Sequence, residues 1–428
     1  MIKNIFTTFT TRLITAFISF VLLLLTTNYL GAEGRGAISL LTASAGLINL
    51  FSGFIGGAAL VYLIPKNRNR TFIWQTLLIS YIWASFVSGI VTCALIFTKS
   101  IPENLAIHIF FIGIFISVFS LHTIILVAFE KIFLQNIATF IQILINFLIF
   151  SSSIFLLKII NIAAFIFSLY FSYIISSLLS FILAIKEFPK EERKIYLWDS
   201  IKEILKFGSV SQLGNVIQYL NYRLSYYILN YYTTLALVGV YSVGVMFSET
   251  VWMIPGSISL VQYSRIANSE DLDYSRNLTL RLAKFSFIAT LFVVFIFILL
   301  PYDIFSGMFG KDFKPVKSVM IYLSPGIAIF GYTVIISHYF AGTGRYIVNT
   351  KADFLGLIIT LIFNFTLVPK YGYIGAAVTA SLSYLTTGLF LLFSFLRETK
   401  TRGKELFISM DDVEFFLIKA GLKNMVIK

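Results

Sequence analysis

The stretch KEFPKEERKIYLWDSIKEILK, residues 186–206, is the longest charged loop of the chain and lies near its middle. It mixes six basic with five acidic residues, whereas apolar runs dominate the sequence on both sides of it. A charged connection between two apolar regions is typical of a linker in a membrane protein built from two halves. We therefore expect an N-terminal bundle over residues 1–185, a cytoplasmic linker loop over 186–206, a C-terminal bundle over 207–396 and a cytoplasmic tail over 397–428.

The composition points to the membrane. Of the 428 residues, 58% are hydrophobic and only 12% are charged, which is more apolar than the core of a soluble domain requires. Apolar segments of about 20 residues, each enough to cross ~30 Å of hydrocarbon, recur along the chain. They predict an all-α integral membrane protein with about twelve transmembrane helices, at 13–30, 38–63, 73–97, 105–129, 134–157, 160–185, 207–231, 236–263, 283–303, 318–341, 351–369 and 373–396. The first is interpreted as an uncleaved span, because no small-residue cleavage site follows it.

The distribution of basic residues predicts the orientation. With the N-terminus inside, 25 of the 33 Lys and Arg residues fall on the inner side and one, Arg223, falls within a span. The other seven fall outside, namely Arg35, Lys99, Lys158, Lys311, Lys314, Lys317 and Lys370. The positive-inside rule therefore places both termini in the cytoplasm. Because the net charge of +13 is spread over loop ends, it favours contact with anionic membrane lipids rather than with nucleic acid.

The two predicted halves can be compared with each other. A shift of 203 residues matches Gly36, Ser39 and Gly53 to Gly239, Ser242 and Gly256. A shift of 213 residues matches Asn136, Ala163 and Ala164 to Asn349, Ala376 and Ala377. Matched positions fall in equivalent spans with six helices between them, so the halves would be related by a pseudo-two-fold axis along the membrane normal. Two such six-helix bundles around a central cavity form the architecture of an alternating-access transporter.

One predicted span carries a permanent charge. The stretch SQLGNVIQYLNYRLSYYILNYY, residues 211–232, contains Arg223, and a charge at this depth costs several kcal/mol unless it meets water, a partner or a ligand. Glu249 lies near the middle of the next span. Two interpretations stay open: an ion pair of Arg223 and Glu249 that locks the helices, or an Arg223 that binds an anionic group in the cavity, for which its planar donors suit phosphate. In the second case Glu249 restrains the arginine or takes up a proton.

The same span is unusually polar. At helical spacing its polar side chains form a stripe along one face, and Asn221 adds a further amide beside it; the stripe consists of Asn215, Gln218, Tyr222 and Ser225. Such a face suits a water-filled cavity better than lipid. Together with Arg223 and Glu249, these residues are the predicted substrate-binding site.

The sequence gives less support to proton coupling, metal binding or catalysis. His122 and His338 lie within spans, where a neutral, hydrogen-bonded imidazole is the commoner fate and proton coupling is the alternative. No His, Cys or carboxylate pair has metal-ligand spacing, and Cys93 is the single cysteine, so no disulfide can form within the chain. The sequence contains no Walker loop, no catalytic triad and no loop large enough to build an extramembrane active site. We therefore expect neither an enzyme nor a cofactor.

Four motifs together suggest a family. They are YLGAEGRG at 29–36, NYRLS at 221–225, VGVYSVGVMFSE at 238–249 and VPKYGYIGAA at 368–377. In their order and spacing the chain resembles the polysaccharide transport family of O-antigen and capsular Wzx-type flippases, within the multidrug/oligosaccharidyl-lipid/polysaccharide exporter superfamily. The resemblance runs from the first span to the twelfth. This chain departs from the family pattern at two positions: it has Asn28 where the family commonly has Arg, and Ser225 where the family often has an acidic residue.

The resemblance implies a function. A member of this family would be a flippase of the bacterial inner membrane that moves an undecaprenyl-diphosphate-linked O-antigen or capsule repeat unit, as in lipopolysaccharide assembly, from the cytoplasmic to the periplasmic leaflet. Its partners would be the lipid-linked glycan, membrane lipids, and the polysaccharide polymerase with its chain-length machinery. Whether a proton gradient, a sodium gradient or neither drives transport stays open.

Three other functions fit the sequence less well. A cation-coupled multidrug exporter of the same superfamily typically uses an acid in the N-terminal half, but residues 1–198 contain no Asp, and Glu33, Glu103 and Glu130 lie at span ends. A lipid II flippase would usually have fourteen spans. A structural membrane scaffold would leave Arg223 with no role beyond its ion pair.

Overall fold

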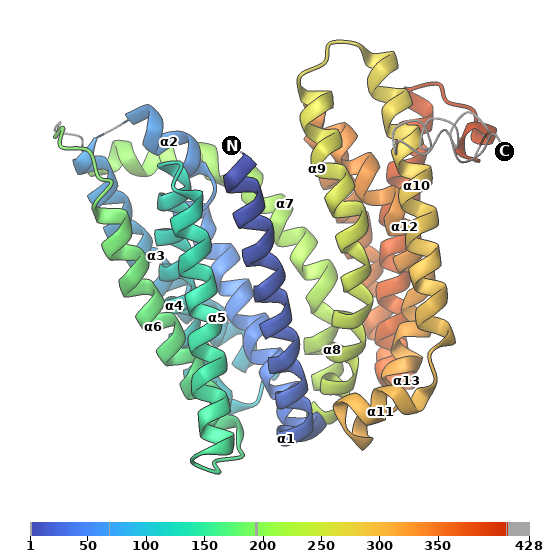
Figure 1. The fold of residues 1–428 in the computed structure, drawn as a ribbon, viewed down its shortest axis with the longest axis horizontal. Helices are drawn as coiled ribbons and strands as arrows, with labels where there is room; N and C mark the ends of the chain where they lie inside the picture. The colour runs from blue at the N-terminus through green and yellow to red at the C-terminus, as the bar shows by residue number, and fades with distance from the viewer. Residues whose placement is uncertain (1, 68, 193–195, 408, 410–428) are drawn as a thin grey trace. The chain divides into compact units, whose positions relative to one another are not determined.

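Helices form the computed structural model of the chain, which describes residues 2–67, 69–192, 196–407 and 409 (Figure 1). The helices that precede the predicted linker are α1 (Ile2–Gly56), α2 (Ala59–Asn67), α3 (Arg70–Phe97), α4 (Glu103–Ala128), α5 (Ile132–Phe155) and α6 (Ile162–Ile185). The later ones are α7 (Leu197–Tyr232), α8 (Leu235–Glu249), η1 (Thr250–Trp252), α9 (Met253–Ala267), α10 (Leu272–Leu299), α11 (Tyr302–Phe309), η2 (Lys311–Phe313), α12 (Val316–Gly342), α13 (Tyr346–Glu398) and η3 (Gly403–Leu406). Most of the predicted tail, at 408 and 410–428, lies outside the described residues.

Ten of the twelve predicted spans fall mainly within one helix, whereas 38–63 crosses the break between α1 and α2, and 236–263 covers α8, η1 and α9. Within the described ranges, nine helical segments are long and apolar enough to cross a membrane. Two of them, α1 and α13, each contain a break and supply two of the predicted spans. The twelfth is α7, whose polar face lowers its hydropathy. The expectation of an all-α membrane protein is confirmed.

Two glycines reverse the chain inside the long helices. Gly31 has φ 66° and ψ −171° within α1, and Gly372 has φ 54° and ψ −129° within α13. This left-handed region is readily open only to glycine, which lacks the Cβ atom that would clash there. In Figure 1 α1 descends from the N-terminus, turns at its lower end and returns. Residues 32–36, predicted to follow the first helix as a loop, therefore begin the second helix of this hairpin.

Contacts divide the chain into two compact units. Unit 1 comprises residues 1–242 and 303–314, and unit 2 comprises 243–302 and 315–428. The boundary lies within α8, whereas the sequence places it in the loop at 186–206. The difference arises because α7 packs on α1: the Tyr219 hydroxyl donates to the Ala43 carbonyl at 2.7 Å, and the Gln212 amide to the Leu50 carbonyl at 2.7 Å. The division into six-helix halves at 1–185 and 207–396 stays a prediction.

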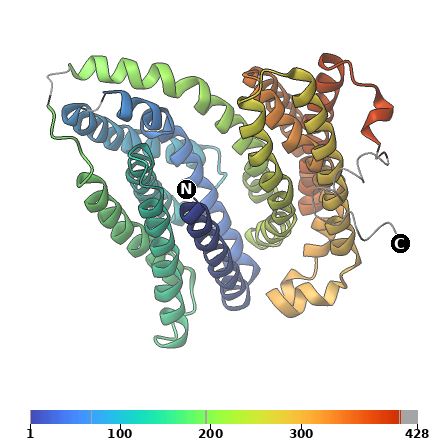
Figure 2. The same ribbon diagram turned by 45° about the horizontal axis from the view of Figure 1, so that its top comes forward.

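Part of the predicted linker loop is helical. α7 begins at Leu197, ten residues before the predicted span, and Figure 2 shows that this long helix bends along its course. This segment is amphipathic, with Ile204 fully buried and Ser200 donating to Gln75 at 2.7 Å. Gly208 follows where a Cβ would lie 2.5 Å from the Phe54 carbonyl oxygen. Tertiary packing therefore extends the helix into a stretch whose charge alone favoured a loop.

Each unit has its own core. In unit 1 an apolar cluster joins α2, α3, α4 and α7 through residues such as Leu63, Phe72, Leu126 and Ile204. In unit 2 a second cluster joins α9, α10, α12 and α13. Large apolar side chains also point outward, among them Phe167, Phe292 and Phe393, each more than half exposed. Such side chains suit a lipid-facing surface.

The closest helix crossing of unit 1 joins α1 to the first part of α8. A Cβ on Gly36 would lie 1.8 Å from the Leu235 carbonyl oxygen, and a Cβ on Gly239 would lie 2.0 Å from that of Ala32. One turn further on, the Ser39 hydroxyl donates to that of Ser242 at 2.8 Å. Gly36 and Gly239, like Ser39 and Ser242, are the pairs that the shift of 203 residues matches.

This crossing predicts that Gly36→Ala and Gly239→Ala each destabilise the protein by roughly 1–3 kcal/mol or more, because a methyl group cannot fit against a backbone carbonyl. Thermal unfolding of the purified protein and its level in the membrane would show the loss. The matched control is Gly256→Ala, since a Cβ at Gly256 meets nothing within 4 Å. There the gain in helix propensity should leave stability unchanged or raised. Equal melting temperatures for all three variants would contradict the account.

Candidate functional site

The polar residues predicted to lie along one face of α7 differ in how exposed they are. Asn215 and Gln218 are exposed and Tyr222 is half-buried, whereas Ser225 is 1% exposed and Asn221 3%. The Asn215 amide donates to the Gln212 side-chain oxygen at 3.3 Å. The predicted stripe therefore reaches solvent as far as Tyr222, and its last member packs inside the protein.

Arg223 is half-buried in unit 1 beside a tyrosine pair. Its guanidinium lies 5.5 Å from the centre of the Tyr226 ring, and one terminal nitrogen donates to the Tyr222 carbonyl at 3.3 Å. Tyr226 in turn meets Tyr241 of α8 edge to face at 5.5 Å. A cation over an aromatic face is stabilised by about 0.5–2 kcal/mol. The arginine is therefore held by an aromatic face and a carbonyl, and it is partly exposed.

A second arginine of unit 1 was not among the predicted site residues. The sequence placed Arg35 in an outer loop, but it lies in the second helix of the α1 hairpin and is 8% exposed. Its Nη1 donates weakly to Thr26 at 3.4 Å, and among the described residues its Nε has no hydrogen-bond partner. Tyr226 interacts electrostatically with it, so this tyrosine neighbours both Arg35 and Arg223.

The burial of Arg35 follows from the glycine crossing. Gly36 brings the α8 backbone against α1 directly after Arg35, which removes the room that a loop would give the guanidinium. Burying a guanidinium without full hydrogen bonding is costly, so such a residue is a candidate for function. The glycines on both sides of it, Gly34 and Gly36, were the available sequence signal, because they permit close helix approach.

Glu249 belongs to unit 2 and lies where a helix breaks. It is the last residue of α8 and is half-buried; the 3-10 turn η1 follows, and α9 then begins at Met253. Pro255 explains the break, because it lacks an N–H and its ring crowds the carbonyl four residues earlier. The sequence analysis placed Glu249 within an unbroken span. Its ion pair with Arg223 stays a prediction.

The two predicted coupling histidines differ in their surroundings. Because the Ser177 carbonyl can only accept, His122 donates through Nδ1 to it at 3.0 Å, and Nε2 accepts from the Tyr81 hydroxyl at 2.6 Å. His122 is 4% exposed, and both of its ring nitrogens have a hydrogen-bond partner. His338 bonds through Nδ1 to the Val334 carbonyl of its own helix at 2.8 Å.

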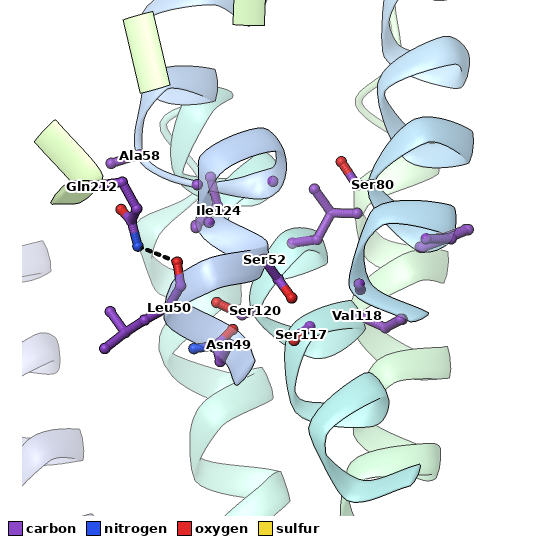
Figure 3. Close-up of a pocket in the computed structure, with 16 residues that line it drawn as sticks. Asn49, Leu50, Ser52, Ala58, Ser80, Ser117, Val118, Ser120, Ile124 and Gln212 are labelled. Atoms are coloured by element: carbon purple, nitrogen blue, oxygen red, sulfur yellow. Dashed lines mark hydrogen bonds between the residues drawn. The ribbon is translucent and has the colours of Figure 1, made fainter. Parts of the chain in front are cut away.

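A cavity of about 180 Å³ lies inside unit 1, between α1, α3, α4 and α7. Figure 3 shows the Gln212 amide reaching the Leu50 carbonyl on one side, with Ser52, Ser80 and Ser117 on the others. Tyr81, the partner of His122, also lines it. At ~30 Å³ per molecule the space would hold about six waters, and it is smaller than most ligand pockets. It is thus too small for an oligosaccharide, and its described lining residues carry no carboxylate.

Metal binding has no structural support within the part of the chain that the structure describes, since no group of three or more His, Cys, Asp or Glu residues is placed to hold an ion.

Known proteins resemble this chain in sequence and in fold. The family model described as "Polysaccharide biosynthesis protein" matches residues 1–263. The capsular polysaccharide biosynthesis protein CapF of Staphylococcus aureus is 29% identical over 162 residues, which are 37% of this chain and 38% of that protein. The chain thus aligns with about two fifths of the length of the curated relatives it matches.

Two solved structures share the fold over nearly the whole chain. The lipid II flippase MurJ, in an inward closed conformation, has a TM-score of 0.70 at 18% identity and covers 99% of this chain and 93% of its own. An inward-facing multidrug resistance MATE family transporter of the MOP superfamily has a TM-score of 0.69 at 14% identity, covering 90% and 94%. These identities establish the fold alone. The match of the family model over more than half of the sequence shows that the chain belongs to the polysaccharide biosynthesis protein family, and its long apolar helices make it a multi-pass integral membrane protein.

Proposed function

We propose that this protein is a flippase that moves an undecaprenyl-diphosphate-linked oligosaccharide, an O-antigen or capsule repeat unit, from the cytoplasmic to the periplasmic leaflet. The observation that carries the proposal is the pair of arginines, Arg35 and Arg223, which both neighbour Tyr226. Both arginines lie on helices with apolar surroundings. A positive charge there is costly, so it indicates a functional role. The family, and the capsule biosynthesis named for CapF, support a glycan as the cargo.

The chemistry of the substrate fits these residues. A lipid-linked diphosphate brings two or more negative charges into a region of low dielectric, where they need fixed positive partners. Arginine offers a planar fork of donors that pairs with phosphate oxygens, and Arg223 is partly accessible. Asn215 and Gln218, exposed on the same helix, supply neutral donors and acceptors for sugar hydroxyls. The polyprenyl chain would stay in the bilayer.

The proposed mechanism is alternating access by two six-helix bundles related by a pseudo-two-fold axis, with a central cavity between them. Two observations support it: solved relatives of this fold include inward-facing and outward-facing forms, and the matched pairs Gly36–Gly239 and Ser39–Ser242 are in contact. In this mechanism Arg223 holds the diphosphate in the inward-open form and releases it when the cavity opens outward. Glu249, beside a helix break, would restrain the arginine between cycles.

A cation-coupled multidrug exporter is the alternative that the shared fold favours. Such an exporter needs an acid to bind its coupling ion, yet residues 1–198 contain no Asp. The described lining of the unit 1 cavity likewise offers amides, serines and a tyrosine rather than a carboxylate. The flippase is therefore the better-supported function.

The first test is Arg223→Ala in a polysaccharide-producing strain that lacks its own flippase. We expect surface polysaccharide to fall about 10–100-fold at unchanged membrane levels of the protein, because one charge-assisted contact to phosphate contributes about 1.5–3 kcal/mol. Arg223→Lys should restore part of the activity, since it keeps the charge without the fork.

The matched control for Arg223→Ala is Arg265→Ala, an exposed arginine in the last turn of α9, which should be fully active. A folded, fully active Arg223→Ala would reduce Arg223 to a helix lock and overturn the proposal.

A second test asks whether Arg35 and Arg223 act on one ligand. Arg35→Gln should lower transport, and Arg35→Lys should retain more of it. If both arginines meet the same diphosphate, the loss in the double variant Arg35→Gln/Arg223→Ala should be smaller than the product of the single losses. Transport rates normalised to protein level would measure this, and strictly multiplicative losses would show that the arginines act independently.

A third test concerns His122. Because its ring is neutral and fully hydrogen-bonded, we expect Tyr81→Phe to lower stability by about 1 kcal/mol, leaving Nε2 unsatisfied, and to leave the pH profile of transport unchanged. Thermal unfolding and transport across pH 5–8 would be measured in parallel. A shifted profile at unchanged stability would instead assign His122 to proton coupling.

A further inference from the structure

The cavity inside unit 1 contains a buried polar group that has no partner in the protein. Ser80 of α3 lines this cavity and is 4% exposed, and among the described residues its hydroxyl has no hydrogen-bond partner. Figure 3 shows the Gln212 amide bonded to the Leu50 carbonyl, whereas the Ser80 hydroxyl stands apart from this bond. Because buried hydroxyls in proteins almost always have a partner, an unpaired one at a cavity wall indicates a polar occupant.

Two serines on other helices offer acceptors to the same cavity. Ser52 of α1 donates to the Ile48 carbonyl at 2.9 Å, and Ser117 of α4 donates to the Gly113 carbonyl at 2.8 Å. Each hydroxyl thereby uses its hydrogen but keeps a lone pair that can accept a further hydrogen bond. Together with Ser80, which can both donate and accept, they present hydrogen-bonding groups from three helices to the cavity (Figure 3).

Glycines keep the space between these hydroxyls open. A Cβ on Gly53 would lie 2.5 Å from Nε2 of Gln212, so glycine at this position gives the amide room to reach the Leu50 carbonyl. A Cβ on Gly56 would lie 3.4 Å from Oγ of Ser80, which is an ordinary contact and would place a methyl group inside the cavity. The volume of about 180 Å³ therefore depends on the absence of side chains at both positions.

The chemistry of the lining favours a neutral ligand with both polar and apolar surfaces. None of the described lining residues is charged, so a phosphate or a metal ion would enter without a counter-charge. Val118, Leu121 and Ile124 add apolar surface, against which a cluster of waters alone would lose hydrogen bonds. A sugar ring combines hydroxyl groups on its edge with C–H groups on its faces, and a single hexose has a volume of the same order as the cavity.

We propose that this cavity binds one neutral sugar residue of the glycan cargo and thereby contributes to the choice of glycan. The inference rests on the proposed function, which supplies the glycan, and adds a sugar site to it. Ala58, in the break between α1 and α2, lines the cavity and is exposed, so the cavity reaches the surface of unit 1. The predicted orientation places this break at the cytoplasmic side, where the glycan is loaded. Because Arg223 does not line the cavity, sugar recognition and diphosphate binding would use different parts of α7.

The test is saturation-transfer NMR on the purified full-length protein, in a detergent without a sugar head group. Glucose, galactose and N-acetylglucosamine are titrated as separate probes, and glycerol serves as a small polyol without a ring. Ser80→Ala removes the unpaired hydroxyl, and Gly56→Ala places a methyl group beside it. The matched control is Ser176→Ala: Ser176 of α6 is also fully buried and without a partner among the described residues, but it does not line the cavity.

We expect at least one of the three sugars to bind to the wild-type protein. Binding to Ser80→Ala and to Gly56→Ala should each be weaker by about fivefold or more, the size expected for the loss of one hydrogen bond, whereas Ser176→Ala should stay close to wild type. The melting temperature of Ser80→Ala should be unchanged or higher, because the lost hydroxyl has no partner among the described residues. Failure of all three sugars to bind, equal binding by Ser80→Ala and Ser176→Ala, or glycerol binding as tightly as the sugars would overturn the proposal.

The binding test and the transport test can fail separately. Free sugars bind without translocation, so a sugar site weakened by Ser80→Ala would stand even if the wild-type protein moved no lipid-linked glycan. Flipping by the wild-type protein without any sugar binding would support the flippase and overturn the sugar site. In Arg223→Ala the free sugars should bind as they do to wild type, because this residue does not line the cavity.

Discussion

The close approach of Gly36 to Gly239 constrains much of unit 1. With no side chain on either residue, the α1 and α8 backbones come near enough for a Cβ to overlap a carbonyl oxygen. This contact aligns Ser39 with Ser242 and brings Tyr241 against Tyr226, the ring that Arg223 covers. It also buries Arg35, the residue directly before Gly36. A packing constraint thus determines where the charges of the candidate site lie.

Charges in this protein are retained where neighbouring groups compensate them. Arg223 has an aromatic face and a carbonyl, and Arg35 has the Thr26 hydroxyl. Near the predicted cytoplasmic surface, Arg276 has Glu405, whose pKa the Arg402 N–H and Arg276 hold below its usual value. Because a carboxyl with a lowered pKa stabilises the fold only while ionised, the contacts of Glu405 with Arg402 and Arg276 should hold at neutral pH and weaken as the pH falls through that lowered pKa.

Much of the fold could be predicted from the sequence, because membrane helices can be recognised by their length and hydropathy. The twelve spans and the self-matching positions could both be read from the sequence, whereas the sequence analysis did not single out Gly31 and Gly372 as the turns of the helical hairpins. The start of α7 was not, since it depends on contacts of Ile204 and Ser200 with residues more than a hundred positions away. Pro255 was a local signal for the helix break after Glu249, but a hydropathy value averaged over the whole span does not reveal it.

The site was predicted less completely than the fold, for the same reason. Arg223 stood out because a charge interrupts an apolar run, whereas Arg35 lies between glycines at the end of a span and looked like a loop residue. The close approach of Gly36 to the Leu235 carbonyl shows that Arg35 lies at a tight helix crossing and not in a loop.

The central claim is that Arg223 takes part in moving a diphosphate-linked glycan across the bilayer. The most direct test is a reconstituted flipping assay with undecaprenyl-diphosphate-linked oligosaccharide in proteoliposomes, in which an enzyme that cannot cross the membrane modifies only outward-facing sugar. Wild-type protein should expose the whole lipid pool with time, and Arg223→Ala at equal density should do so at the rate of protein-free liposomes. Equal rates for wild type and Arg223→Ala would contradict the account.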